Sequence, residues 1–574
     1  MILLAAMALV VGSGAVVAAW ILIKLIALAA NIAWFGRWSV APAEIADAAS
    51  GVRVIVVPVV GSLLIGLMAR FGSPKIRGHG IPEAIEAILF GQSRLSAKVA
   101  ILKPLSSAIS IGSGGPFGAE GPIIMTGGAL GSLFAQCFHL SAAERKTLLV
   151  AGAAAGMTGI FGTPVAAVLL AVELLLFEWK PRSFVPVVAA VLASFAWRPL
   201  LIGQGALFPF AGHIPGDHWA LLAAAGIGLL MGLQAGLLST LLYRIEDLFH
   251  RLPIHWMWWP ALGAIVVGCG GWIEPHALGA GYANIQNLLD GSMVRDALIL
   301  LLVVKAAIWL VALGSGTSGG VLAPLLIMGG ALGCLAGQWL PGDHGFWALL
   351  GMAGIMSAAM RAPLTGAIFA IELTGRLDAL PCSVAAAATG YAVAVLLLRR
   401  SILTERIARR GRHVVQEYGV DPLAVAQVAG IMARDPATLP ADMLVADAAD
   451  FFSREARYRS YPVIDGDRHP VGLVSRADVL RWDLDALPDD VTLADLVSDQ
   501  SLPLAHPDMA ATAVADLMLA EDVSRVPVVD GAGRIVGIVA LRDLLRARLA
   551  QHREERHRER FAARPAASPV PIDA

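Results

Sequence analysis

Charged residues are scarce in this chain of 574 residues: only 15% are Asp, Glu, Lys or Arg, whereas 57% are hydrophobic. In soluble globular domains about a quarter of the residues are charged. A water-soluble protein of this composition would expose a large apolar surface. The scarcity of charge therefore excludes a purely soluble protein and indicates that lipid is part of its solvent.

The chain also lacks a basic excess and paired cysteines. It has 43 basic and 44 acidic residues, so it does not show the basic excess of a nucleic-acid-binding protein. Its cysteines form no Cys-x-x-Cys pair and lie in apolar runs, at Cys137, Cys269, Cys334 and Cys382. We expect them to be buried small side chains rather than metal ligands or disulfides.

Apolar segments of helical length recur through residue 398. The long ones are 2–34, 53–70, 143–160, 164–177, 184–200, 218–242, 258–272, 297–313, 346–360 and 381–398. Shorter ones, interrupted by Gly or Pro, are 80–90, 98–111, 121–138 and 321–340. A full span needs about 20 residues, and broken helices are tolerated in a membrane only where they line a protein-walled cavity. We predict an all-α polytopic membrane domain over residues 1–400.

This predicted domain repeats itself. GSGGPFGAEGPIIMTGGALGSL at 112–133 matches GSGTSGGVLAPLLIMGGALGCL at 314–335 at half of the positions. Lys103 and Lys305 each lie nine residues before their GSG, and PVAAVLLAVE ending at Glu173 matches PLTGAIFAIE ending at Glu372. The halves are about 1–200 and 218–400. Matching broken helices in two halves favour a transport site between them.

The C-terminal part has the composition of a soluble protein. An Arg cluster follows the last apolar segment and predicts that this end lies in the cytoplasm. After a linker at 401–423, residues 424–482 and 493–549 form a second pair of repeats, each with a helical start, two strands joined through Asp-Gly, and a closing helix. We expect a small α/β domain, followed by a disordered tail at 550–574.

Three Gly/Pro-rich loops each precede a broken helix. They are Gly78-His79-Gly80-Ile81-Pro82, Gly118-Ala119-Glu120-Gly121-Pro122 and Gly320-Val321-Leu322-Ala323-Pro324. A helix N-terminus presents free N–H groups and the positive end of the helix dipole. Several such ends in mid-membrane would solvate an anion with partial charges alone, and no Lys or Arg falls inside these loops. Because a carboxylate can occupy an anion site and leave it on protonation, we expect Glu120 to gate the path. A capping role for Glu120 is the alternative.

The order of these motifs resembles the CLC family of chloride channels and chloride/proton antiporters, and the C-terminal repeats resemble CBS domains. The resemblance covers nearly the whole chain. It implies a homodimer with one pore per subunit and two halves of opposite orientation. It further implies a gating role for Glu120 and anion contacts from His79, Gly80, Ile81, Gly121, Val321 and Leu322. Chloride or a similar anion would be the ligand, with no cofactor required, in a bacterial inner (plasma) membrane.

Several positions depart from the family pattern. His79 replaces a serine, Ala119 a basic residue, Leu322 a phenylalanine, and Leu403 the tyrosine near the last helix. As a ligand, His79 would make anion binding sensitive to pH; alternatively its ring turns away and only backbone amides bind.

The proton path is also altered. The antiporters' inner glutamate is Leu174 here, so Glu173 and Glu178 are the candidate proton-pathway residues, and Glu178 could instead pair with Lys180 and Arg182. A channel-like or loosely proton-coupled pathway and a strict chloride/proton antiporter both stay open.

In the CBS pair, the resemblance implies an adenine-nucleotide site. The ribose-contacting pattern is matched by Gly472, Ser475 and Asp478, whereas the second module keeps Gly537 and Asp543 but has Ala540 in place of a hydroxyl. A purely structural dimerisation module is the other interpretation.

Two other function classes compete. A CBS-regulated divalent-cation channel would need acidic residues in its pore, and 297–313 and 346–360 contain none. An intramembrane serine protease could use Ser113 with His79, but Ser315 is the equivalent of Ser113, which favours a turn role and a protein that is not an enzyme. Lys103 and Lys305 lie in apolar runs, and we expect ion pairs with Glu83, Glu86 or Glu372; a direct role in conduction is the alternative.

Overall fold

The computed structural model describes residues 1–91, 93–216, 218–398, 400–410, 423, 426–484, 488, 490–498, 502–547 and 549. The chain divides into two compact units, Met1–Glu417 (unit 1) and Tyr418–Ala574 (unit 2). The predicted tail at 550–574 and positions 411–422 of the predicted linker lie outside the described residues.

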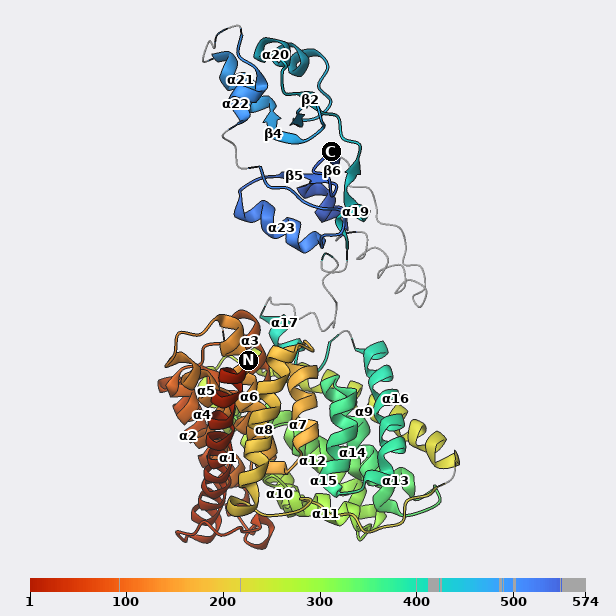
Figure 1. The fold of residues 1–574 in the computed structure, drawn as a ribbon. Coiled ribbons are helices and arrows are strands. Elements are labelled where there is room, and N and C mark those ends of the chain that lie inside the picture. The colour runs from red at the N-terminus through yellow and green to blue at the C-terminus, as the bar shows by residue number, and fades with distance from the viewer. Residues whose placement is uncertain are drawn as a thin grey trace, which may run out of the picture. The chain divides into compact units, whose positions relative to one another are not determined.

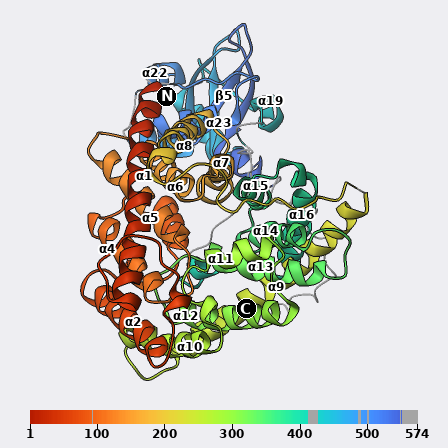
Figure 2. The same ribbon diagram turned by 90° about the horizontal axis from the view of Figure 1, so that it is seen from below.

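Unit 1 is helical throughout its described part (Figures 1 and 2). Its α-helices are α1 Ile2–Ala30, α2 Arg53–Phe71, α3 Ile81–Phe90, α4 Ala97–Gly112, α5 Glu120–Gln136, α6 Ala142–Phe161, α7 Pro164–Leu170, α8 Pro181–Leu201, α9 His218–His250, α10 Trp259–Ile273, α11 Tyr282–Leu289, α12 Arg295–Gly314, α13 Leu322–Gly337, α14 His344–Met360, α15 Pro363–Thr374, α16 Leu380–Leu397 and α17 Glu405–Arg409. Two π-helical segments, Asn31–Phe35 and Ala171–Leu176, extend α1 and α7.

Among the described residues, seven helical segments are long and apolar enough to cross a membrane, and shorter apolar helices lie between them. The interrupted segments predicted from the sequence form α3, α4, α5 and α13, which begin or end at glycine-rich loops. This arrangement confirms the prediction of a polytopic helical domain with broken helices.

Small residues bring equivalent helix pairs together in the two halves. A Cβ added to Gly127 of α5 would lie 2.2 Å from the carbonyl oxygen of Gly152 in α6, and one on Gly351 of α14 would lie 2.2 Å from that of Gly329 in α13. Helices in a membrane associate through such close backbone contact. The repeated GGALG sequence therefore has a packing role in each half.

The prediction that all four cysteines are buried is wrong for two of them. Cys334 and Cys382 are buried, whereas Cys137 and Cys269 are exposed on the outside of unit 1. The outer surface of this unit is itself apolar, so an exposed cysteine there does not need a polar environment.

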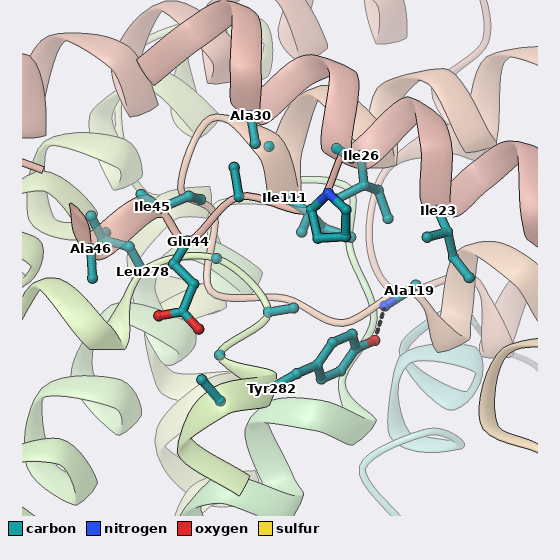
Figure 3. A pocket seen from close by; sticks show the side chains of 18 of the residues that line it. Ile23, Ile26, Ala30, Glu44, Ile45, Ala46, Ile111, Ala119, Leu278 and Tyr282 are labelled. Carbon is teal, nitrogen blue, oxygen red and sulfur yellow. Dashed lines mark hydrogen bonds between the residues drawn. The ribbon is translucent and has the colours of Figure 1, made fainter. Parts of the chain in front are cut away.

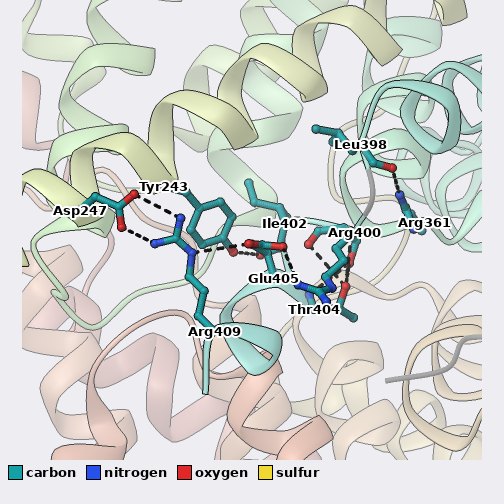
Figure 4. A network of polar contacts seen from close by, with 10 residues as sticks. Tyr243, Asp247, Arg361, Leu398, Arg400, Ile402, Thr404, Glu405 and Arg409 are labelled. Atoms are coloured by element: carbon teal, nitrogen blue, oxygen red, sulfur yellow. Dashed lines mark hydrogen bonds and ion pairs between the residues drawn. The ribbon is translucent and has the colours of Figure 1, made fainter. Parts of the chain in front are cut away.

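The segment after α16 is fastened to the helices beside it (Figure 4). Arg361 donates to the carbonyl of Leu398, and the Tyr243 hydroxyl donates to the carbonyl of Ile402. Arg409 of α17 pairs with Asp247 of α9. These contacts fix Leu398, Ile402 and Arg409 against the neighbouring helices of unit 1.

The described residues of unit 2 form two three-stranded sheets, with strand orders β1-β6-β5 and β2-β3-β4. In both, an antiparallel hairpin supplies two strands: β3 with β4 and β5 with β6. The strands are β1 Ala433–Arg434, β2 Leu439–Pro440, β3 Ser460–Ile464, β4 Pro470–Ser475, β5 Arg525–Val529 and β6 Ile535–Ala540. The helices are α19 Val428–Ile431, α20 Val445–Arg454, α21 Arg476–Leu484, α22 Leu493–Val497 and α23 Ala511–Ala520.

In unit 2, the first segment of each repeat packs against the other repeat. β1 pairs with β6 of the second repeat, and Val428 packs in the core formed by α23, β5 and β6. In return, Leu493 and Val497 of α22 pack in the core of the first repeat. The repeats are therefore interlocked rather than self-contained, which differs from the simple order expected from the sequence.

Candidate functional site

The three predicted loops meet in the interior of unit 1. Gly78 pairs with Ser318 as a parallel bridge, and Gly118 pairs with Gly320 as an antiparallel bridge. The amide of Gly320 donates to the carbonyl of Gly118 at 2.9 Å. These bridges bring the first turns of α3, α5 and α13 to one place, although the loops are far apart in the sequence.

Glu120 lies at the centre of this arrangement and is fully buried. A Cβ on Gly118 or Gly320 would lie 2.0 or 2.5 Å from its carboxylate, so the carboxylate fills the space that the two glycines leave. The amides of Glu120 and Ala323 face the carboxylate, but neither oxygen makes a hydrogen bond of normal geometry within the described part of the chain. The carboxylate thus lies between the N-termini of α5 and α13.

His79 lies against the start of α5. It is 3% exposed, and its Nδ1 has no hydrogen-bond partner among the described residues. A Cβ on Gly121 would lie 1.9 Å from the His79 carbonyl oxygen, so only glycine fits there. Gly80, with a φ of 88°, turns the chain into α3 at Ile81. These contacts bring His79, Gly80, Ile81 and Gly121 together.

Full positive charges lie behind the His79 loop, which the loop sequences alone did not indicate. The guanidinium of Arg406 in α17 abuts Gly78, where a Cβ would lie 1.7 Å from its Nη1. Arg406 and Arg410 each approach the buried Glu83 at 3.5 Å, and Arg410 also pairs with Glu86. The signal for these residues is the Arg cluster after α16.

The expected ion pairs of Lys103 and Lys305 are wrong within the described part of the chain. Lys103 Nζ donates to the carbonyls of Ile76 and Gly78, at 2.9 and 2.6 Å, and to Ser318 Oγ at 3.0 Å. Lys305 Nζ donates to the carbonyls of Ala277 and Gly279. Each lysine therefore clamps the loop before a short helix. Carbonyl oxygens satisfy these buried ammonium groups without a carboxylate.

Val321, Leu322 and Leu403 are fully buried, Val321 and Leu322 at the start of α13. Leu403 supplies no hydroxyl, and the hydroxyl of Tyr243 beside it already donates to the carbonyl of Ile402. None of these three side chains therefore offers an anion a hydroxyl.

The two Pro-x8-Glu glutamates cap each other's helices across the repeat. Glu173 accepts hydrogen bonds from the amides of Leu364 and Thr365 and from the Thr365 hydroxyl, and Glu372 accepts from the amides of Val165 and Ala166. A carboxylate at a helix N-terminus is favoured by the helix dipole. The geometry gives both residues a structural task.

Glu178 makes surface contacts at the end of the segment Ala171–Leu176. It accepts a hydrogen bond from Ser183 at 2.9 Å and pairs with Lys180 at 3.0 Å and with Lys146 at 3.6 Å. The expected partner Lys180 is present, no pair with Arg182 is found among the described residues, and Lys146 was not anticipated.

A cavity of about 490 Å³ reaches Ala119, the residue before Glu120 (Figure 3). Its wall includes the ends of α1, α4 and α6 and the loop before α11. Tyr282, the first residue of α11, lines it, and its hydroxyl accepts from the amide of Ala119 at 3.5 Å. Sequence reasoning missed Tyr282. The signal was the likeness of Gly279-Ala280-Gly281-Tyr282 to Gly78-His79-Gly80-Ile81.

The candidate nucleotide residues of unit 2 lie at the start of the helix that follows each hairpin. Asp478 accepts from the amide and hydroxyl of Ser475, and its other oxygen pairs with Arg481 at 2.8 Å. Asp543 accepts from the amide of Ala540 at 3.0 Å. Both carboxylates thus have their two oxygens engaged, because Asp543 Oδ1 lies 3.8 Å from Arg542 Nε, but Asp543 lacks the hydroxyl partner.

Comparison with known proteins identifies the class of this molecule. The family described as voltage-gated chloride channel matches residues 61–395, and the CBS domain matches 428–485 and 493–550. The chain belongs to the voltage-gated chloride channel (CLC) family and carries a pair of CBS domains.

Relatives carry both channel and exchanger names. The voltage-gated ClC-type chloride channel ClcB of Salmonella typhi is 30% identical over 353 residues, which cover 59% of this chain and 84% of that protein. The H(+)/Cl(-) exchange transporter ClcA of Salmonella arizonae is 30% identical over 321 residues, or 54% of this chain and 68% of that protein.

Solved structures share the fold. A slow cyanobacterial Cl-/H+ antiporter has a TM-score of 0.62 and 20% identity, covering 70% of this chain and 98% of its own. A eukaryotic CLC transporter has a TM-score of 0.59 and 19% identity, with 94% and 97% covered.

Family membership establishes a multi-pass membrane protein of the CLC anion transporters, and the family consists of transporters rather than enzymes. The serines agree with this. Ser113 and Ser315 each donate to a carbonyl of the preceding helix, at 3.1 and 2.7 Å, so both hydroxyls close turns.

Proposed function

We propose that this protein carries chloride or a similar small inorganic anion through a path that Glu120 gates. The observation that carries the proposal is the buried Glu120 carboxylate between the first turns of α5 and α13. Helix N-termini favour an anion at that place. The carboxylate holds the position of the transported ion and must leave before the ion enters.

The anion would be held by the ends of three helices. The start of α3 offers His79, Gly80 and Ile81. The first turns of α5 and α13 offer the amides near Gly121, Val321 and Leu322. Partial charges of this kind bind an ion without trapping it. Arg406 and Lys103 lie behind the loop and add a positive field.

We propose a channel-like or loosely proton-coupled pathway rather than a strict antiporter. Leu174 has no proton to exchange, Glu173 is held by backbone amides of α15, and Glu178 is held by Lys180 and Ser183. A strict antiporter is the alternative, because some relatives are named exchange transporters. In that case Glu173 and Glu178 are the groups that would pass the proton.

The assembly and location are inferred with the function. The protein would be a homodimer in a bacterial inner (plasma) membrane, with the CBS pair in the cytoplasm, because the Arg cluster after α16 favours that side. The CBS pair would bind an adenine nucleotide through Asp543, whose carboxylate can accept both hydroxyls of a ribose, with Ser475 and Asp478 as the equivalent positions in the other repeat.

Purified protein in liposomes tests the proposal. A chloride gradient should drive anion flux, whereas a matched gradient of a divalent or monovalent cation at equal chloride should drive none. A pH electrode should record little proton movement per chloride. Cation-driven flux would refute anion transport, and a fixed ratio of protons to chloride would establish the antiporter instead.

A further inference from the structure

We propose that the hydroxyl of Tyr282 is a ligand for the transported anion on the cavity side of Glu120. This inference rests on the proposed function and adds an outer contact to it. The tyrosine expected near the last helix is Leu403, so a hydroxyl is missing at one place, and Tyr282 provides one at another.

The loop that carries Tyr282 is built like the loop that carries His79. Lys305 Nζ donates to the carbonyls of Ala277 and Gly279, as Lys103 does to Ile76 and Gly78. Gly281 has a φ of 69° and directly precedes α11. The second half therefore presents a short helix, α11, in the manner of α3, and its first residue is a tyrosine instead of an isoleucine.

Further contacts fix the orientation of the ring. The ring of Phe208 packs against it with centroids 5.8 Å apart, and Asn284 Nδ2 donates to the carbonyl of His276 at 2.7 Å, which fastens the loop to α11. Figure 3 shows the hydroxyl pointing to Ala119. A ring held in this way loses little entropy when it binds a ligand.

The hydroxyl has an unused hydrogen. It accepts from the amide of Ala119, and no acceptor for its own O–H is found in the described part of the chain. The neighbouring charged group that acts on it is the Glu120 carboxylate, whose oxygens make no hydrogen bond of normal geometry to any described residue. A donor and an acceptor thus face one region at the end of the cavity.

An anion suits this region better than a cation. The Tyr282 O–H is the donor that remains, since the Ala119 amide already donates to the hydroxyl oxygen, and Lys305 lies behind the loop, close enough for its charge to act on Glu120. Among the other ionisable groups on the cavity wall, Lys24 and Glu44 have opposite signs, and His276 contacts the carboxylate of Glu274. When Glu120 moves aside, an anion arriving from the cavity would meet the Tyr282 hydroxyl first.

Tyr282→Phe tests the proposal, because it removes the hydroxyl and keeps the ring that packs on Phe208. Hydrogen bonds to a charged group contribute about 1.5–3 kcal/mol, so the half-saturating chloride concentration for flux should rise about tenfold or more. Tyr391→Phe, a matched change elsewhere in unit 1, should leave it unchanged. An unchanged half-saturating concentration in Tyr282→Phe would overturn the proposal.

The same substitution in the Glu120→Ala background separates two roles of the hydroxyl. If Tyr282 binds the anion, the rise persists without the carboxylate. If the rise disappears, Tyr282 acts only through Glu120 and the proposal fails. Absence of anion flux in the parent protein would refute the proposed function itself, whereas intact flux with an inert Tyr282→Phe would refute this inference alone.

Discussion

The two halves of unit 1 share their scaffold but differ in their chemistry. Lys103 and Lys305 clamp equivalent loops, and Glu173 and Glu372 cap each other's helices. At the centre the halves diverge, because the sequence position of Glu120 in the first half is that of Leu322 in the second.

This difference has a simple physical reason. Two helix N-termini that meet can share one anion, and a carboxylate from each would place two negative charges in the same buried space. A leucine in the second half leaves the Ala323 amide free to face Glu120. Residues that occur in both halves thus stabilise the fold, whereas residues that occur in only one half, such as Glu120, determine the chemistry of the site.

Replacing Lys103 or Lys305 should have the largest effect, which is a loss of thermal stability. Lys103→Met removes the donor of the Ile76 carbonyl, but the Gly78 carbonyl still accepts from the Gly319 amide and Ser318 Oγ still accepts from Ser106. Lys305→Met removes the donor of two carbonyls, those of Ala277 and Gly279. At about 1–3 kcal/mol for each unsatisfied buried group, both variants should melt earlier in detergent, Lys305→Met by more. A larger loss for Lys103→Met would contradict this interpretation of the two clamps.

Replacing His79 should weaken anion binding, whereas a change at Ala280, the equivalent position in the second half, should not. Loss of one N–H donor to a bound anion in His79→Ala should raise the half-saturating chloride concentration about tenfold. Ala280→Ser, at the equivalent place in the second half, should change it little. Equal flux curves for the parent and His79→Ala would mean that the ring turns away and only backbone amides bind.

The crossed helix caps should have a moderate effect. Glu173→Gln and Glu372→Gln each replace one acceptor oxygen with an amino group that faces an amide, at a cost of about 1–2 kcal/mol. The loss should be greater for Glu173, which accepts three hydrogen bonds. Thermal melting measures this. If Glu173→Gln instead changes the protons moved per chloride at unchanged stability, the residue serves the proton path.

The smallest effect is expected at the hairpin turns of unit 2, where the equivalent turns of the two repeats can be compared. Asp465 accepts from the amides of Asp467 and His469, as Asp530 does from Ala532 and Arg534. The carbonyl of Ala532 and the side chain of Asp465 raise the pKa of His469 above its usual value.

A raised folded pKa gives stability that is fully present below the unfolded pKa, about 6.5, and is lost as pH rises through the folded value. The melting of unit 2 in the full chain should therefore weaken slightly from pH 6 to 8. His469→Arg, which copies Arg534, should remove that trend. A trend that survives the substitution would assign it to another group.

Much of this site could be predicted from the sequence. The Gly/Pro-rich loops predicted helix starts, and their repeat predicted that the starts meet, because a loop rich in glycine inside an apolar chain has few other tolerated places. The acidic Glu120 stood out for the same reason.

Other features could not be predicted because they depend on partners distant in the chain. An apolar run with one lysine indicates that Lys103 is buried. It does not indicate that backbone carbonyls, rather than Glu83, accept the hydrogen bonds of its ammonium group. Arg406 reaches Gly78 only after the chain has returned from α16. The exchange between the CBS repeats is likewise invisible in strand periodicity, which does not specify which sheet β1 joins.

The most direct test measures chloride flux into liposomes at a series of pH values for the parent, Glu120→Ala and the matched variant Leu322→Ala. With the carboxylate removed, flux should persist and become independent of pH, whereas Leu322→Ala should keep the pH dependence of the parent. Flux through Glu120→Ala that follows pH as the parent does would contradict the gate.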